Sequence, residues 1–252
     1  EGLVEETQQR WQRIVGIAEP HRGGRFAALD GYRALAAIGV LVYHVAGNAR
    51  LTTGGGPVAP LLANLGNFGV AVFFLLSGFL LYRPFADAGL RPGSTPRWGR
   101  FWRHRLLRIY PAYWVALTAY IWLIGLRMEI NVENMATIYL LAQTYRPYFG
   151  FAALSVAWTL CIEVSFYVAL PFIAWAIRRG IGARARSARA ALQAQLLGIV
   201  ALVVFAYTYR VTVAAQATGP GDNQHLWLPN YLDWFGLGML LAIAVVWRDL
   251  GH

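Results

Sequence analysis

The sequence predicts an all-α membrane protein, a polytopic bundle of about six transmembrane helices with a cytoplasmic N-terminus. Of its 252 residues, 58% are hydrophobic and only 13% are charged, whereas soluble domains have about 25% charged residues. Long apolar runs recur along nearly the whole chain, and a bilayer removes the need for a charged surface. The basic residues gather in alternate connections between these runs. The composition therefore argues against an ordinary water-soluble enzyme.

Six apolar segments are candidates for spanning helices. Backbone groups in lipid must be hydrogen-bonded within the segment, so spans of this length can only be helices. The segments cover residues 31–47, 66–82, 106–126, 157–177, 193–211 and 231–247. Asp30 and Asp233 lie at the starts of the first and sixth segments, where a carboxylate suits an N-cap because it accepts hydrogen bonds from exposed backbone amides.

The arginines orient the predicted bundle. All 22 basic residues are arginines, and 18 of them fall on one side of the six spans. The other four are Arg50, Arg127, Arg146 and Arg210. Basic residues are enriched in cytoplasmic loops, so we expect a cytoplasmic N-terminus, with 48–65, 128–156 and 212–230 outside. This topology explains the net charge of +10 without nucleic acid, which would require a basic face on a polar domain.

The connections complete the predicted organisation. Residues 1–25 are expected to form a cytoplasmic N-terminal segment, and 26–252 a single membrane domain. An amphipathic stretch at 135–142 is expected to lie along the membrane interface. The Arg- and Ala-rich run at 180–190 is expected to form a connector helix. Cys161 is the only cysteine, which excludes a disulfide within the chain.

Ionisable side chains inside spans are costly and are therefore functional candidates. Arg33 and His44 are 11 residues apart in the first span, so they project from nearly the same helix face with a rise of roughly 16 Å. A neutral imidazole in a dry bundle can accept a proton. A snorkelling arginine and a packed, hydrogen-bonded histidine are the alternative interpretation of this pair.

Glu163 is expected at a depth similar to that of His44, because the fourth span starts on the outer side. A buried carboxylate must be neutralised or paired, and His44 is the nearest candidate in depth. A carboxylate that orients an imidazole and stabilises its protonated form is common in acyl transfer. A protonated glutamate in a structural hydrogen bond is the alternative.

Five arginines lie among aromatic residues just before and at the start of the third span. They are Arg97, Arg100, Arg103, Arg105 and Arg108. Guanidinium groups match the geometry of phosphates, and Arg105 and Arg108 share a helix face at i, i+3. The pattern indicates either a phosphorylated cytosolic ligand or anionic lipid headgroups.

Four strings, in the right order, together resemble the acyltransferase-3 family of integral membrane acyltransferases. They are Leu29–Ala37 followed by His44, Phe73–Leu81, Arg105–Pro111 and Trp158–Tyr167. The resemblance covers about residues 26–247. Two features depart from the family pattern: Val164 stands where members usually have a second glutamate, and members usually have about ten spans. We therefore expect the C-terminal part of the family domain to be missing from this chain.

The resemblance implies an O-acyltransferase of the inner (cytoplasmic) membrane. Such enzymes move an acyl group, commonly acetyl from acetyl-CoA, to a hydroxyl of a carbohydrate-containing or lipid acceptor, without a metal. His44 would be the catalytic base or acyl carrier, with Arg33 and Glu163 as its catalytic partners. Arg105 and Arg108, with the nearby Arg103, would bind the CoA phosphates. Ser77-Gly78-Phe79 would allow close helix packing.

A non-enzymatic transporter is the alternative from another class. His44 and Glu163 would then form a proton relay. Transporters often have interrupted spans in corresponding positions of two halves, and the sequence shows no such pair.

Overall fold

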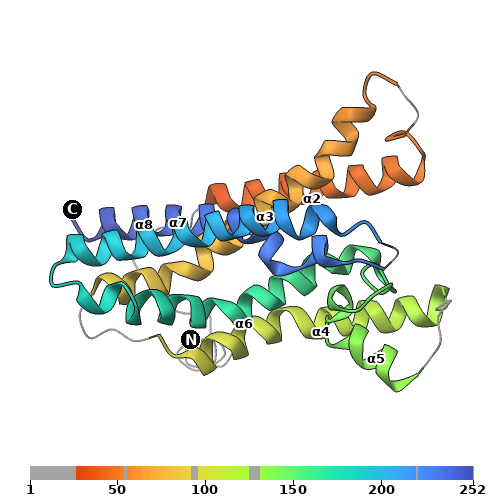
Figure 1. Cartoon of the computed structure of the whole chain (residues 1–252). Helices are drawn as coiled ribbons and strands as arrows, with labels where there is room; N and C mark the ends of the chain where they lie inside the picture. The colour runs from red at the N-terminus through yellow and green to blue at the C-terminus, as the bar shows by residue number, and fades with distance from the viewer. Residues whose placement is uncertain (1–26, 54–55, 92–95, 125–130, 220, 252) are drawn as a thin grey trace, which may run out of the picture.

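The computed structural model describes residues 27–53, 56–91, 96–124, 131–219 and 221–251, and every regular element in these ranges is helical (Figure 1). The α-helices are α2 (Ala27–Asn48), α3 (Ala59–Leu90), α4 (Trp98–Ile124), α5 (Val132–Tyr139), α6 (Trp158–Arg179), α7 (Ala188–Thr212) and α8 (Leu232–Asp249). The 3-10 helices are η1 (Gln143–Tyr145), η2 (Ser155–Ala157), η3 (Gly182–Arg184), η4 (Ala214–Gln216), η5 (Gln224–Leu226) and η6 (Leu228–Tyr231). The predicted all-α class is confirmed for these residues. The predicted segment 1–25 lies outside them.

Each of the six long helices contains or closely overlaps one predicted span. Four stretches are long and apolar enough to cross a membrane, and they cover 59–90, 155–179, 188–216 and 228–249. The other two long helices carry charge at their starts: α2 contains Asp30 and Arg33, and the apolar part of α4 begins only after Arg108. The chain is thus a multi-pass membrane protein by the length and apolarity of its helices, while the count of six spans stays a prediction.

Alternate connections lie at opposite ends of the bundle. Figure 1 shows the α6–α7 connection and the C-terminal end of α8 at one end, with the α2–α3 and α7–α8 connections at the other. This arrangement is the one that the arginine distribution requires. Which end faces the cytoplasm is a prediction from the arginines alone.

Cysteine labelling tests that orientation. In a Cys161→Ser background, we expect Asn64→Cys and Asp222→Cys to react with a membrane-impermeant maleimide added outside intact cells, because both positions lie in the predicted outer connections. Gly93→Cys should react only after the membrane is opened. Labelling of Gly93→Cys in intact cells, with protection of the other two, would reverse the orientation.

Glycines bring three of the helices into close contact. A Cβ on Gly78 of α3 would lie 2.1 Å from the backbone oxygen of Phe235 in α8, and a Cβ on Gly238 would lie 2.0 Å from that of Leu75. A Cβ on Gly69 would lie 2.7 Å from the backbone oxygen of Ala36 in α2. Small residues of this kind let helix backbones approach within a membrane. The expected packing role of Gly78 is confirmed.

Stacked aromatic rings fill the space beside the α3–α8 contact. The ring of Phe235 stacks on those of Phe74 and Phe166, at centroid distances of 4.6 and 3.9 Å. This core joins α3, α6, α7 and α8. A second core joins α4 to α5 and α6 around Leu117, Ile138 and Cys161.

Hydrogen bonds attach α4 to its neighbours. The Tyr113 hydroxyl donates to the backbone oxygen of Ile138 at 2.8 Å, and the indole of Trp114 donates to that of Tyr139 at 3.0 Å. On the other side, the Trp102 indole donates to the backbone oxygen of Tyr167 in α6 at 2.9 Å. The amphipathic stretch expected at 135–142 corresponds to α5, which begins three residues earlier.

Three sequence-based interpretations are wrong. Asp30 is not an N-cap, because α2 starts at Ala27; it lies in the first turn, 3.9 Å from Arg33. Asp233 also lies inside a first turn, and it accepts a hydrogen bond from Arg210 of α7 at 2.8 Å. The run 180–190 forms no continuous helix. It contains only the short 3-10 helix η3, and α7 then starts at Ala188, directly after its N-cap Ser187.

Candidate active site

A cavity of about 520 Å³ lies between α2, α3, α4 and α6. Its polar lining comes from residues far apart in the sequence: Arg33, Ser77, Arg105, Arg108, Tyr113, Glu163 and Tyr167. Leucine, isoleucine, valine, alanine and phenylalanine side chains form the rest of the wall. Most ligand sites combine an apolar wall with a few convergent polar groups in this way.

The start of α4 determines where the arginine motif lies. Because α4 begins at Trp98, Arg105 and Arg108 are about two and three turns into the helix rather than at its end. Arg105 is half-buried and Arg108 is more exposed. The bond from the Trp102 indole to α6 holds this part of α4 against the helix that carries Glu163.

The cavity has an excess of positive charge. Arg105 interacts electrostatically with Arg108 and Arg33, which repel it, and with Glu163, which attracts it. Glu163 is the only carboxylate among the lining residues. Three guanidinium groups beside one carboxylate favour the binding of an anion, since arginine forms charge-assisted, bidentate hydrogen bonds with phosphate and carboxylate groups.

Glu163 is held by two hydroxyl groups. The Ser77 hydroxyl of α3 donates to Glu163 Oε1 at 2.9 Å, and the Tyr167 hydroxyl, one turn along α6, donates to the same oxygen at 2.6 Å. Among the described residues, no hydrogen bond reaches the other oxygen, Oε2. The carboxylate is thus oriented through one oxygen, and the second can accept a hydrogen bond from a substrate.

The structure brings together four of the six site residues proposed from sequence. Arg33, Arg105, Arg108 and Glu163 line one cavity. His44 is half-buried further along α2, with its ring 5.1 Å from that of Tyr43 in an edge-on arrangement, and it does not line the cavity. No hydrogen bond between His44 and Glu163 occurs, although both are described. Arg103 is exposed outside the cavity.

Sequence reasoning did not find the partners of Glu163. Tyr167 follows Glu163 at i+4, the spacing that places two side chains on one helix face, so this contact had a signal in the sequence. Ser77 lies 86 residues away on another helix, and only the packing of α3 against α6 brings it there. Among the described residues, no cluster of three His, Cys, Asp or Glu could hold a metal ion.

Residues 26–250 match the model of a protein family described as an acyltransferase domain, acyltransferase 3. Because this match covers nearly the whole chain, the chain belongs to the acyltransferase-3 family. The helices that are long and apolar enough to span a membrane and the arginine-lined cavity agree with membership of this family of membrane acyltransferases.

Several curated proteins are similar to the chain. The O-acetyltransferase OatA of Staphylococcus aureus strain NCTC 8325 is 29% identical over 158 residues, which cover 58% of this chain and 24% of OatA. A protein of Staphylococcus aureus strain COL, named as a candidate O-acetyltransferase, is 30% identical over 162 residues, with the same two coverages of 58% and 24%. Nodulation protein 10 of Rhizobium leguminosarum bv. viciae is 34% identical over 125 residues, which cover 42% of this chain and 32% of that protein.

The chain thus spans about a quarter of the length of the two Staphylococcus aureus relatives and about a third of the rhizobial one. No solved structure matches it.

Proposed function

We propose that this domain, in the inner membrane, transfers an acyl group, acetyl in the simplest case, from acyl-CoA to a hydroxyl of a carbohydrate-containing or lipid acceptor. The observation that carries the proposal is the joint placement of Arg33, Arg105, Arg108 and Glu163 on one cavity. Family membership and the O-acetyltransferase relatives support acyl transfer as the reaction class.

The arginines would bind the donor. Acyl-CoA carries several phosphate groups at the end remote from its thioester, and a phosphate is the anion that arginine forks bind best. Arg105 and Arg108 are one helix turn apart, so both can contact a diphosphate at once. Arg33 adds a third positive charge from α2. The long pantetheine arm of CoA separates the thioester from these contacts, so the chemistry can occur away from the arginines.

His44 would act on the acceptor. The acceptor hydroxyl oxygen attacks the thioester carbonyl carbon while its proton passes to the His44 imidazole. The carbon–sulfur bond then breaks, and the CoA sulfur leaves and takes up the proton from the His44 imidazolium. Transfer of the acyl group first to an imidazole nitrogen and then to the acceptor is the covalent variant of the same role. His44 is half-buried beside Tyr43 on α2, the helix that also carries the cavity residue Arg33, and this shared helix supports the proposal.

Glu163 would assist the transfer as a fixed negative charge. Its orientation by Ser77 and Tyr167 reduces the reorganisation required when positive charge develops on a nearby base. The pairing of Glu163 with His44 expected from sequence stays a prediction, and a substrate hydroxyl between the two residues is an arrangement that the free Oε2 allows.

The donor assignment can be tested by removing two arginines. We expect Arg105→Ala combined with Arg108→Ala to weaken CoA binding by about 100-fold, because each charge-assisted hydrogen bond contributes roughly 1.5 kcal/mol at the lower end of its usual range. Binding should be measured by calorimetry on the protein in neutral detergent, and the remaining affinity should be less sensitive to salt.

Arg100→Ala is the matched control, since Arg100 is an exposed arginine of the same helix that does not line the cavity. It should bind CoA as the wild type does. Unchanged CoA binding in the double variant would assign Arg105 and Arg108 to lipid headgroups instead of the donor. The sequence assigned Arg103 to CoA binding, whereas the structure places Arg103 outside the cavity. CoA binding by Arg103→Ala distinguishes these two assignments.

A further inference from the structure

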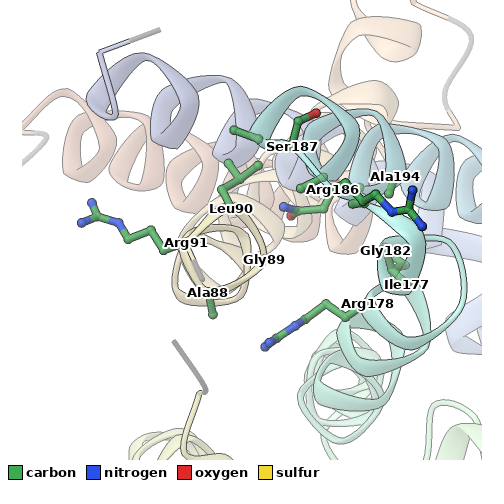
Figure 2. A pocket seen from close by; sticks show the side chains of 14 residues that line it. Ala88, Gly89, Leu90, Arg91, Ile177, Arg178, Gly182, Arg186, Ser187 and Ala194 are labelled. Atoms are coloured by element: carbon green, nitrogen blue, oxygen red, sulfur yellow. The ribbon is translucent and has the colours of Figure 1, made fainter. Parts of the chain in front are cut away.

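A second cavity, of about 460 Å³, lies where α3 and α6 end and α7 begins. Three arginines from three segments line it: Arg91 at the end of α3, Arg178 near the end of α6, and Arg186 in the connection before α7 (Figure 2). The hydroxyl-bearing N-cap Ser187 also contributes to the wall. This cavity shares no lining residue with the candidate active site, so the proposed acyl transfer does not account for it.

A buried glutamine forms part of the cavity wall. Gln195 of α7 is only 3% exposed; its Oε1 accepts a hydrogen bond from the Tyr82 hydroxyl at 3.1 Å, and its Nε2 donates to the backbone oxygen of Ala86 at 3.4 Å. Gly89 provides the space, because a Cβ there would lie 2.6 Å from Gln195 Nε2. These contacts tie α7 to α3 and fix the wall of the cavity.

The lining carries positive charge and no carboxylate. Arg91 is partly compensated by Asp87, at 2.6 Å, which lies on the same helix outside the lining. Arg178 interacts electrostatically with Tyr82. Arg186 is exposed. Figure 2 shows the three arginines on different sides of the cavity, so an anion in the opening would lie among long side chains that can turn toward it.

The position of the cavity indicates where its ligand comes from. Three membrane-spanning helices end or begin here, which places the arginines at the level of the lipid headgroups. Arg178 also lines a neighbouring cavity with Trp98 and Trp175, and tryptophans concentrate at the membrane–water interface. Leu90, Ile177 and the alanines of the wall provide apolar surface beside the charges.

We propose that this cavity binds the phosphate-bearing headgroup of an anionic phospholipid of the surrounding membrane. The arginines hold the phosphate, and the apolar wall contacts the glycerol and the first methylenes of the lipid. Basic pockets between transmembrane helices bind anionic headgroups for this reason. The assignment depends on the membrane placement of α3, α6 and α7 and is independent of the proposed acyl transfer.

Lipid retention tests this site. The full chain, purified in neutral detergent, is titrated with phosphatidylglycerol, and bound lipid is counted by native mass spectrometry. At about 1 kcal/mol for each interfacial arginine, we expect Arg186→Gln to weaken phosphatidylglycerol binding about fivefold, and Arg178→Gln with Arg186→Gln to weaken it roughly 30-fold. The single variant changes an exposed side chain, so it keeps the test valid if the double variant does not fold.

Arg189→Gln is the matched control, since Arg189 is an exposed arginine in the first turn of α7 that does not line the cavity; it should retain the lipid as the wild type does. Equal retention in the Arg186→Gln variant and the control would overturn the proposal. A parallel titration with inorganic phosphate without lipid separates the two sources of the anion: arginine-dependent phosphate binding without phosphatidylglycerol retention would reassign the cavity to a soluble phosphate compound.

Discussion

Replacement of His44 by alanine should lower acyl transfer by about 100- to 10,000-fold, the usual cost of losing a general base, while CoA binding stays nearly intact. A hydroxyl is a poor nucleophile at neutral pH, so a nearby imidazole that accepts its proton accelerates its attack. CoA binding should be preserved because the arginines of the cavity are on α4 and at the opposite end of α2. The measurement is transfer of radiolabelled acetyl from acetyl-CoA in membranes that contain the full-length protein, with CoA affinity measured in parallel.

Glu163→Gln is the companion variant and should also be severely impaired. Glutamine keeps a side-chain oxygen that can accept the hydrogen bonds from Ser77 and Tyr167, so the variant removes the charge with little change in packing. A labelled acyl adduct on His44 would favour the covalent route over the base route. Near-normal turnover in His44→Ala would contradict both routes and would make the histidine a packing residue.

A methyl group at the α3–α8 contact should destabilise the fold strongly. Gly78→Ala would place a Cβ within 2.1 Å of the Phe235 backbone oxygen, a distance that forces the two helices apart. Overpacking of this kind costs about 3 kcal/mol at the upper end of the usual range. The expected result is a clear fall in the thermal unfolding temperature of the purified protein in detergent.

Gly99→Ala is the control for that measurement. Gly99 lies in α4, and a Cβ there would have no atom within 4 Å, so alanine should leave stability unchanged or raise it by up to about 1 kcal/mol through its higher helix propensity. If Gly78→Ala unfolded at the same temperature as Gly99→Ala, α3 and α8 would not be in contact at this position.

The sequence predicted the helices better than their ends. Apolar runs identify membrane helices because the bilayer demands them, and this signal located all six long helices. The ends depend on charged and capping residues at the interface. Thus α3 extends to Leu90, beyond the predicted 82, through residues that pack on α7, and α4 begins at Trp98 rather than 106. The expected connector helix failed where two glycines and an N-cap serine interrupt the run.

The site was predictable in composition but not in arrangement. Arg33 and Glu163 were singled out because charges inside spans are rare, and Arg105 and Arg108 because clustered guanidinium groups match the geometry of phosphates. The number of residues from the ends of their spans predicted that Glu163 and His44 lie at a similar depth in the membrane. In the structure, Glu163 lines the same cavity as Arg105, and its pairing with His44 stays a prediction. Contacts between helices, such as that of Ser77 with Glu163, depend on the tilt and rotation of each helix, which are set by packing against its neighbours. No periodic pattern in the sequence reports this tilt and rotation.

The glycine contact between α3 and α8 has a consequence for how the protein is made. Gly78 and Gly238 are 160 residues apart, and ribosomes add about 5–20 residues per second. The partner of α3 therefore emerges roughly 10–30 s after α3 itself. During that interval α3 must remain in the bilayer with its Gly78 face covered by lipid or by helices made before α8, and its long apolar sequence suits it to do so. The contact between α3 and α8 can therefore form only after α4, α6 and α7 have been made.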